Sequence, residues 1–362
     1  NDEKIATDLF KKDMYLSASK VDEYYKCAFK YFCKFGIGAV PRTKAEMDPM
    51  QTGTVVHYVL EQIISNNKKD DFVSLSDAKI AIEVNRYLKE YLENKIYSSG
   101  ELDKRFNYQF MRLSKMLTFV IIRLREEFAQ SDFEAKAFEL KIGNEEAEDM
   151  VKYVPIKLKD GGTITIKGSI DRVDTFEENG RQYVRVIDYK SGGKKFELSD
   201  IIYGINLQMF IYLFFFFFSD HKYSGIGSGV LYMHAARDVY SVSNKKDAED
   251  LSGEDNKSFK MKGVFLNDDE NPMIEHMEKN LGRYGKFIDV NTTKFGYSGN
   301  VVTLAQFGAI SKKIDNLIAR MGEELHKGNI NQNPVEGGHN SDICSYCDYI
   351  DICKNRKEIQ IR

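Results

Sequence analysis

The sequence predicts an α/β or α+β core that contains a mixed β-sheet and follows a large helical region; of the two classes we take α/β. Three observations support this prediction. Residues 48–130 have helical periodicity, residues 134–189 are rich in strand-forming residues, and a helix followed by a strand is indicated over 199–235. Because 362 residues are many for one compact core, we expect one large, elaborated domain.

Composition and charge are those of an ordinary globular protein, with 42% apolar residues, 30% charged residues and a net charge of −3. Without an overall basic charge, any contact with nucleic acid must come from a local patch. The longest apolar run, Met209 to Phe218, has ten residues, which is too few to span a bilayer. The charged start is unlike a signal peptide, and the odd number of cysteines, five, argues against a secreted disulfide framework. We therefore expect a cytoplasmic protein with no membrane partner.

The first part of the chain is predicted to be mainly helical. Residues 1–14 form a polar N-terminal segment, and "SASKVDEYYKCAFKYFCKF" at 17–35 indicates a capped helix followed by an aromatic, lysine-rich stretch. Asp48 and Pro49 have the character of an N-cap and a first helical residue. Three long helices are expected in this part, over about 49–65, 76–97 and 103–130.

The period then changes to that of strands. The turn "EENG" at 177–180 is predicted to join the last two strands as a hairpin. A helix capped by Ser199 or Asp200 is expected to run through Phe218, and a strand follows at 225–235. The four strands before that helix are predicted at 134–142, 151–158, 163–175 and 182–189.

We expect a single domain over residues 15–355. Its catalytic core covers about 132–240 and follows a helical part at about 40–131. An irregular insertion is expected over about 241–300, and a helix at about 303–328 with a cysteine-bearing tail closes the domain over 301–355.

Two acids and a lysine stand out in the predicted hairpin. Asp188 and Lys190 in "VIDYKSG" are two positions apart, so they share one face of a strand. Asp171 in "GSIDRVD" lies on the partner strand, and two adjacent carboxylates repel each other unless a cation lies between them. The alternatives are a surface ion pair and a site for a hard divalent ion such as Mg²⁺. In the second case Lys190 would hold a water or a phosphate oxygen, and Glu139 would orient that water or Lys190.

Other candidates are weak when taken alone. His57 lies on an apolar helix, where a lone histidine is more often structural than a metal ligand. Gln208 and Tyr212 share one helix face, and their ordinary interpretation is helix surface. The Phe214–Phe218 run is either a helix end buried under the sheet or a contact with a missing subunit or domain.

The tail "CSYCDYIDIC" places Cys344, Cys347 and Cys353 close together, which favours a metal or cluster site. A fourth ligand would come from Cys27 or Cys33. A bond from Cys27 to the tail would close a very long loop, worth roughly 5–6 kcal/mol in the chain-entropy description. Spacing alone leaves zinc and iron–sulfur open. We expect Cys33 to pack as a small hydrophobic residue.

Taken in order, "GTVVH", "GSIDRVD", "VIDYKSG" and "QMFIY", with one early cysteine and three late ones, resemble the RecB-type nuclease domain of the PD-(D/E)XK superfamily. The start and the tail most resemble the iron–sulfur-containing C-terminal domains of the AddB (RexB-like) group. The resemblance implies a restriction-endonuclease-like mixed sheet flanked by helices, a large helical insertion and a C-terminal iron–sulfur staple. The residue roles that it implies are metal ligation by His57, Asp171, Asp188 and the carbonyl of Tyr189, catalysis by Lys190, DNA contact by Gln208 and Tyr212, and binding of a [4Fe–4S] cluster by Cys27, Cys344, Cys347 and Cys353.

The same resemblance implies a Mg²⁺- or Mn²⁺-dependent exonuclease that cleaves single-stranded DNA from the 5′ end. It implies work with an AddA-like helicase–nuclease partner subunit in double-strand-break repair by homologous recombination. No Walker loop is present in the sequence, so we expect no ATP hydrolysis by this segment. The alternative is a non-catalytic DNA-binding scaffold stapled by a cluster. Two interpretations, a DNA channel and packing beside the cluster, remain equally open for Tyr24, Tyr25, Lys26, Lys30 and Tyr31.

Overall fold

A nine-stranded mixed sheet forms the centre of the protein in the computed structural model, which describes residues 3–40, 49–95, 104–143, 150–152, 154–190, 196–235, 259–335, 343–345 and 347–353. The order of the main strands is β11-β8-β7-β6-β5-β2-β3, and β1 and β4 also pair with β5. Their bounds are β1 Asp13–Ser17, β2 Glu134–Ile142, β3 Met150–Val151, β4 Ile156–Lys157, β5 Thr163–Glu178, β6 Arg181–Lys190, β7 Ile226–His234, β8 Lys262–Leu266 and β11 Val301–Val302.

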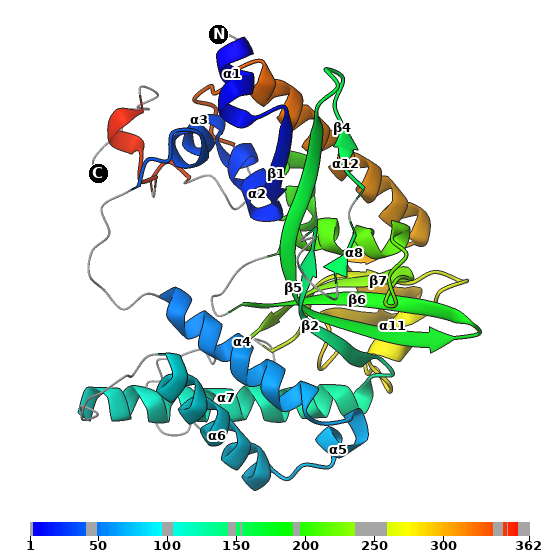
Figure 1. Cartoon of the computed structure of the whole chain (residues 1–362). Coiled ribbons are helices and arrows are strands. Elements are labelled where there is room, and N and C mark those ends of the chain that lie inside the picture. Colours follow the sequence, from blue (N-terminus) through cyan, green and yellow to red (C-terminus); the bar gives the residue numbers. More distant parts are fainter. Residues whose placement is uncertain are drawn as a thin grey trace, which may run out of the picture.

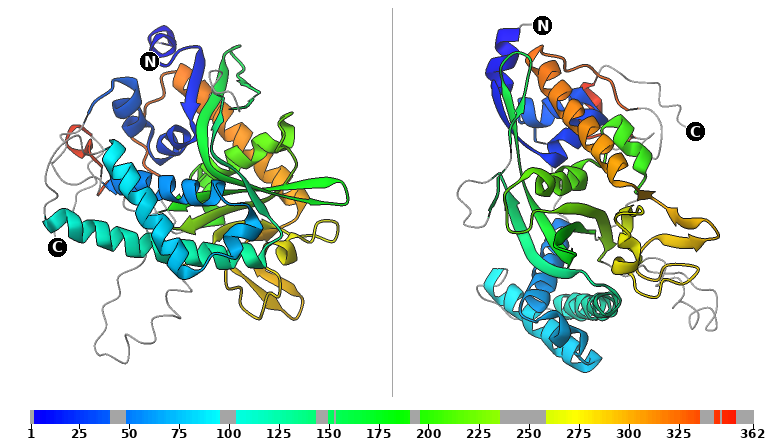
Figure 2. Two further views of the ribbon diagram at one scale, coloured as in Figure 1. Left: turned by 60° about the horizontal axis from the view of Figure 1, so that its bottom comes forward. Right: turned by 90° about the vertical axis from the view of Figure 1, so that its right-hand side faces the viewer.

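Helices cover both faces of this sheet (Figures 1 and 2). The helices α4, α6 and α7 pack together on one side, while α8 packs against β6 and β7 on the other side and contacts α12. This arrangement confirms the predicted α/β class with a mixed central sheet flanked by helices. The helices are α1 Glu3–Phe10, α2 Ala18–Lys26, α3 Ala28–Tyr31, α4 Pro49–Ser65, α5 Lys69–Val73, α6 Asp77–Lys95, α7 Lys104–Gln130, α8 Gln208–Phe218, α11 Met273–Met277 and α12 Leu304–His326.

The β5–β6 hairpin forms as its turn residues indicate. Asn179 and Gly180 have φ values of 51° and 72°, so both central positions of the turn are left-handed, as a tight primed turn requires. From β6 the chain crosses through α8 to β7, which pairs with β6 in parallel. This crossover brings α8 over the end of β6, where Asp188 and Lys190 lie.

The helix predicted from residue 199 or 200 is interrupted. A 3₁₀ helix covers Leu198–Tyr203, and α8 begins only at Gln208. Between them, Gly204 and Asn206 have φ values of 80° and 60°, which a continuous helix cannot contain. The buried Asp22 accepts hydrogen bonds from the backbone N–H groups of Asn206 (3.2 Å) and Leu207 (3.1 Å), just before α8 starts.

Other segments are more ordered, or less regular, than the sequence analysis expected. The N-terminal segment contains α1 and the start of β1, and β1 pairs in parallel with β5. In place of one strand over 151–158 there are the two short strands β3 and β4. Within the segment expected to be irregular, the chain forms β8, α11 and a hairpin of β9 Val290–Thr293 and β10 Gly296–Gly299. The antiparallel pairing of β8 with β7 explains the difference, because a strand inside a sheet gains stability from neighbours that are distant in sequence.

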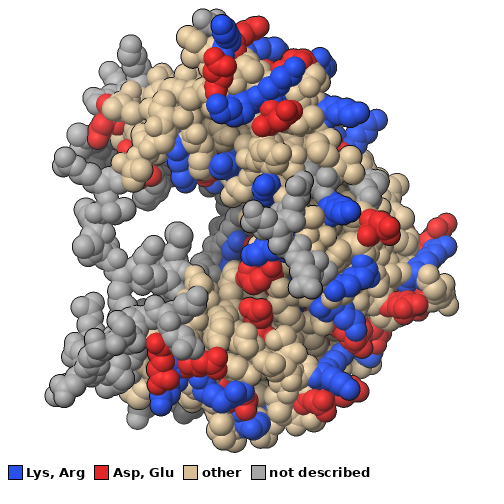
Figure 3. Space-filling view, in the orientation of Figure 1, with Lys and Arg blue, Asp and Glu red and all other residues tan. Residues whose placement is uncertain are grey.

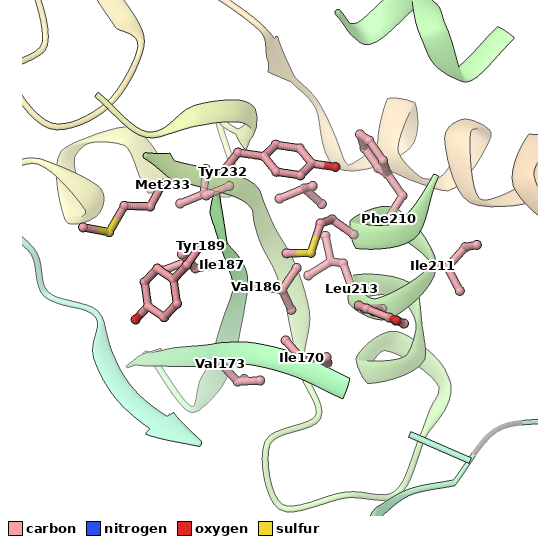
Figure 4. Close-up of a cluster of buried hydrophobic side chains, with 14 of the residues drawn as sticks. Ile170, Val173, Val186, Ile187, Tyr189, Phe210, Ile211, Leu213, Tyr232 and Met233 are labelled. Atoms are coloured by element: carbon pink, nitrogen blue, oxygen red, sulfur yellow. The ribbon is translucent and has the colours of Figure 1, made fainter. Parts of the chain in front are cut away.

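The phenylalanine run of α8 is part of the core. Phe214, Phe215 and Phe216 are buried against the sheet and α12, as are Phe210 and Leu213 earlier in the helix. Figure 4 shows Phe210 and Leu213 on the side of α8 that faces β5, β6 and β7. Of the two alternatives left open, burial within this chain therefore accounts for these residues. None of the helices in the described residues is long and apolar enough to cross a membrane.

Candidate active site

His57, Glu139 and Asp171 lie close together although they come from three separate elements. Each offers one ligand atom, and these atoms all lie within 4.8 Å of one another; no other such group of three or more histidine, cysteine or acidic residues exists in the described part of the chain. Nδ1 of His57 is 3.3 Å from Oε1 of Glu139, and Nε2 is 3.6 Å from Oδ2 of Asp171. The elements α4, β2 and β5 thus converge on one point.

The backbone of Tyr189 completes this group. The Tyr189 N–H donates a hydrogen bond of 2.8 Å to Asp171, and the Tyr189 carbonyl oxygen lies 3.3 Å from Nε2 of His57. Both ring nitrogens of His57 therefore face oxygen atoms of the site. The imidazole ring lies at the place where Glu139, Asp171 and the Tyr189 carbonyl meet.

The pKa shifts of His57, Asp171 and Glu139 also reflect how close these groups lie to one another. Burial alone would lower the pKa of His57, but its hydrogen bond to Glu139 and the charge of Asp171 raise the pKa above its ordinary value. Burial and then the charge of Asp188 raise the pKa of Asp171 to about 7. The hydrogen bond from His57 lowers the pKa of Glu139. The surroundings of the two aspartates therefore favour additional positive charge.

Asp188 and Lys190 form an ion pair at the end of β6. Nζ of Lys190 lies 2.5 Å from Oδ2 of Asp188, whose side chain is only 5% exposed. Asp188 lies near enough to Asp171 to raise its pKa, but it is not part of the 4.8 Å group. Glu139 is bonded to His57 and to the hydroxyl of Ser169 (2.9 Å), so in this arrangement it orients His57. Asp188 is the acid that contacts Lys190.

The residues present fit a hard divalent cation. Three carboxylates, an imidazole and a carbonyl oxygen are the donor types that such ions accept in proteins. Burial, and then the charge of Asp188, raise the pKa of Asp171, and a cation bound between the two acids would oppose this rise. Glu139 joins the candidate ligands, although the sequence analysis gave it only an orienting role.

Gln208 and Tyr212 lie on α8 near the acids. Burial raises the pKa of Tyr212 to about 12; a hydrogen bond from Gln208 opposes this rise, and the charges of Asp188 and Asp171 add to it. A side chain at Gly168 would come within 2.3 Å of the Tyr212 hydroxyl, so only glycine leaves room for it there. The sequence prediction that these residues share one face near the site is consistent with this geometry.

Residues 15–354 match the sequence profile described as the PD-(D/E)XK nuclease superfamily. The chain belongs to this superfamily. The PD-(D/E)XK assignment agrees with the mixed sheet and with acids on adjacent strands.

Curated relatives extend the comparison. An AddB protein from Thermoanaerobacter sp. (strain X514), named as a subunit of an "ATP-dependent helicase/deoxyribonuclease", is 30% identical over 96% of this chain, which covers 30% of the relative. Proteins of the same name from Clostridioides difficile (strain 630) and Clostridium novyi (strain NT) are 30% and 29% identical over 98% of the chain, and 31% of each relative is covered. The chain thus spans about a third of the length of these AddB proteins.

The sequence analysis missed a buried ionic network behind the PD-(D/E)XK acids. Arg172 and Arg185, both fully buried, bind Asp174 from two sides at 2.8–2.9 Å. Arg185 also bonds Glu127 of α7 at 2.8 Å, and Arg172 donates a hydrogen bond to the Tyr189 hydroxyl at 3.3 Å. The available signal was Arg172 and Asp174 at alternate positions of "DRVD", together with Arg185 within an otherwise apolar strand.

The four cysteines that the resemblance implies as cluster ligands line one common cavity. Apolar side chains surround them there, and Lys30 is the one charged residue among the described residues of the lining. A thiolate-bound group fits this set of donors. The fifth cysteine, Cys33, is buried, as expected for a small hydrophobic residue. The lining consists of Cys27, Phe29, Lys30, Gln332, Pro334, Ile343, Cys344, Cys347, Ile350 and Cys353.

The proposed channel aromatics belong to the core instead. Tyr24 and Tyr31 are buried, and Tyr25 donates a hydrogen bond of 2.7 Å to the carbonyl of Leu317 on α12. Lys26 and Lys30 both pair with Glu23. Packing in the core therefore describes Tyr24 and Tyr31, while DNA contact by Lys26 and Lys30 stays a prediction.

Proposed function

We propose that this chain is the nuclease domain of an AddAB-type helicase–nuclease and that it cleaves single-stranded DNA as a metal-dependent exonuclease. The observation that carries the proposal is the convergence of His57, Glu139 and Asp171 beside the Asp188–Lys190 pair. The names of the relatives, which join a helicase and a deoxyribonuclease, support the assignment. An AddA-like partner subunit, a cytoplasmic location and a role in recombinational repair of double-strand breaks are parts of the same proposal.

In this proposal, separate residues of the chain bind the metal ion, stabilise charge on the phosphate and position the DNA. Asp171, Asp188, His57, Glu139 and the Tyr189 carbonyl hold Mg²⁺ or Mn²⁺. When bound, such an ion supplies Lewis acidity to a water and to the scissile phosphate. Lys190, fixed by Asp188, contributes positive charge as negative charge develops on the phosphate. Tyr212 and Gln208 position the DNA strand beside these groups.

A [4Fe–4S] cluster held by Cys27, Cys344, Cys347 and Cys353 is proposed as a structural group. The shared cavity supports it. No three sulfur atoms among the described cysteines lie within 4.8 Å of one another.

The test is a nuclease assay on end-labelled single-stranded DNA with Mg²⁺ or Mn²⁺. The Lys190→Ala variant is expected to lose activity by about 10²–10³-fold, the range typical of a lost electrostatic donor. Short products that retain a 5′ label would support digestion from the 5′ end. Cleavage that survives Lys190→Ala unchanged would refute the catalytic role, and binding without cleavage by the wild type would favour the non-catalytic scaffold.

A further inference from the structure

A line of polar and aromatic side chains runs along β5 toward the candidate metal ligands. It begins at Tyr15 of β1, which is opposite Thr165 in the parallel β1–β5 register. Tyr15 is 61% exposed, and Nζ of Lys167 lies 4.5 Å from the centre of its ring. On the opposite side of β1, Met14 and Leu16 are buried, so packing of β1 does not require an aromatic ring at Tyr15.

The line continues without a break to the acids. Ser169 is two positions beyond Lys167, and it pairs across the strands with Lys141, whose Nζ donates a hydrogen bond of 3.3 Å to its hydroxyl. The same hydroxyl donates to Glu139, which bonds His57. Each step from the exposed aromatic ring to the imidazole is therefore a direct contact or a neighbouring position on β5.

The length of this line suits a few nucleotides. Four residues of strand separate Lys167 from Asp171, which corresponds to about 13 Å at about 3.3 Å per residue. About four stacked nucleotides of one DNA strand have this length. If the strand is extended, fewer nucleotides are needed to span the same distance. Figure 3 shows a hollow in the molecule, and basic side chains lie next to acidic ones on its right-hand wall.

We propose that Tyr15, Lys167, Lys141 and Ser169 form a binding track for a single DNA strand that leads to the cleavage site. The ring of Tyr15 stacks on a base two to four nucleotides from the cleaved bond. The two lysines bind the intervening phosphates, and Ser169 hydrogen-bonds to the backbone. Stacking on an aromatic ring combined with phosphate contacts is sequence-tolerant, as an exonuclease requires. This inference rests on the proposed nuclease function and names its substrate subsite.

The experiment places 2-aminopurine at successive positions of a single strand bound to the Asp188→Asn variant, which cannot cleave it. Fluorescence quenching is expected in a narrow window near the site. Adding Tyr15→Ala is expected to abolish the quenching and to weaken binding about fivefold or more, whereas Tyr15→Phe preserves both. Adding Lys167→Gln is expected to reduce the salt dependence of binding by about one phosphate contact.

A matched control exists elsewhere on the surface. Lys294 lies over the ring of Phe295 at 5.7 Å, and Phe295 is 93% exposed beside the β9–β10 hairpin. Phe295→Ala and Lys294→Gln are expected to change neither quenching nor salt dependence. Equal effects of Tyr15→Ala and Phe295→Ala, or no effect of Tyr15→Ala on a wild-type protein that binds and cuts DNA, would overturn the track. Failure of the wild type to cleave would refute the proposed function itself.

Discussion

At the scale of single residues, negative and positive groups act in opposite directions on the ionisation of Asp171. This carboxyl group accepts a hydrogen bond from the Tyr189 N–H and lies beside the imidazole of His57, yet burial, and then the charge of Asp188, raise its pKa to about 7. In the absence of a metal ion, His57 opposes this rise but does not cancel it. Binding of a divalent cation would therefore release protons from the site, and its affinity should rise with pH.

A stability measurement can test this balance in the absence of metal. The unfolded chain ionises Asp171 at its ordinary pKa of 3.8, while the folded protein does so at about 7. Between these values the folded state binds more protons than the unfolded state, so stability falls as pH rises through this window. Asp171→Asn removes the penalty. We expect the variant to be more stable than the wild type by up to about 4 kcal/mol at pH 8, at about 1.4 kcal/mol per pKa unit.

Urea unfolding in EDTA at pH 8 and pH 4.5 measures this difference, which should fall to about a quarter at the lower pH because the unfolded chain ionises at 3.8. Asp160 provides a control, because its pKa is shifted in the opposite direction to that of Asp171. Burial alone would raise its pKa, but the Gly162 N–H and His326 lower it, so Asp160→Asn should destabilise the protein at pH 8. A stabilisation by Asp171→Asn that is the same at both pH values would contradict the charge argument.

The sequence was sufficient to predict Asp171, Asp188 and Lys190 as a group, because strand alternation and a short hairpin constrain where they lie. It could not predict the contacts of Glu139. Those contacts depend on the register between β2 and β5, which aligns Lys141 with Ser169 and so brings Ser169 to Glu139. Register comes from packing that local sequence does not encode.

At the scale of elements, the β5–β6 hairpin carries the site at one end and the buried ionic network behind it. Arg172 links the two, because it binds Asp174 and also the hydroxyl of Tyr189, whose backbone contacts Asp171 and His57. Groups that hold metal ligands in place typically affect metal affinity 10–100-fold. The network therefore positions the backbone of Tyr189 from behind.

Tyr189→Phe tests this positioning because it removes only the hydroxyl that Arg172 contacts. We expect the affinity for Mn²⁺, measured by electron paramagnetic resonance titration, to fall about tenfold with the fold intact. Tyr183→Phe on the same strand is the matched control, since it removes a buried hydroxyl that bonds Asn271 away from the site. Equal Mn²⁺ affinities for the two variants would refute a role for the Arg172 contact.

The start of α8 depends on an element far away in the sequence. Asp22 of α2 accepts the N–H groups of Asn206 and Leu207, and Gln208 is the next residue. Asp22→Ala is expected to destabilise the protein by about 1–2 kcal/mol, as the loss of a helix cap does, and to lower nuclease activity by displacing Gln208 and Tyr212. Urea unfolding and the end-label assay measure the two effects. Asp22→Asn retains one acceptor oxygen, so its stability and its nuclease activity should lie between those of the wild type and Asp22→Ala. If Asp22→Ala changes neither stability nor activity, Asp22 does not fix the start of α8.

The same contact shows why the break before α8 was not predicted. The apolar sequence from Ile201 to Phe218 is compatible with one long helix, and Gly204 alone is a weak signal. The decisive features are the left-handed Asn206 and the buried carboxylate of Asp22, which accepts the N–H groups of Asn206 and Leu207 at the start of α8. By contrast, the bounds of β2 and of α12 were predicted to within two residues, because their own patterns determine them.

At the scale of the whole molecule, the two ends of the described chain meet. The N–H of Phe29 donates to the carbonyl of Asn331 at 3.2 Å, and the N–H of Val335 donates to the carbonyl of Lys26 at 2.9 Å. The Tyr349 hydroxyl donates to the carbonyl of Ala39 at 2.7 Å. These contacts surround the cysteine-lined cavity, so a cluster bound there would join α2 and α3 to the C-terminal tail.

Removing one ligand tests the staple. Cys27→Ser is expected to lose the visible absorbance and the iron of the anaerobically purified protein. Because a link between Cys27 and the tail restricts the unfolded chain by roughly 5–6 kcal/mol, the variant should melt well below the wild type and lose protection of its tail from proteases. Cys33→Ser is the control: Cys33 is near enough to Cys27, Cys347 and Cys353 for their charges to raise its pKa, but it does not line the cavity, so iron content should stay unchanged. A colourless wild type with stoichiometric zinc would contradict the cluster. A Cys27→Ser protein with normal iron and melting temperature would show that the two ends are held by their hydrogen bonds and packing alone.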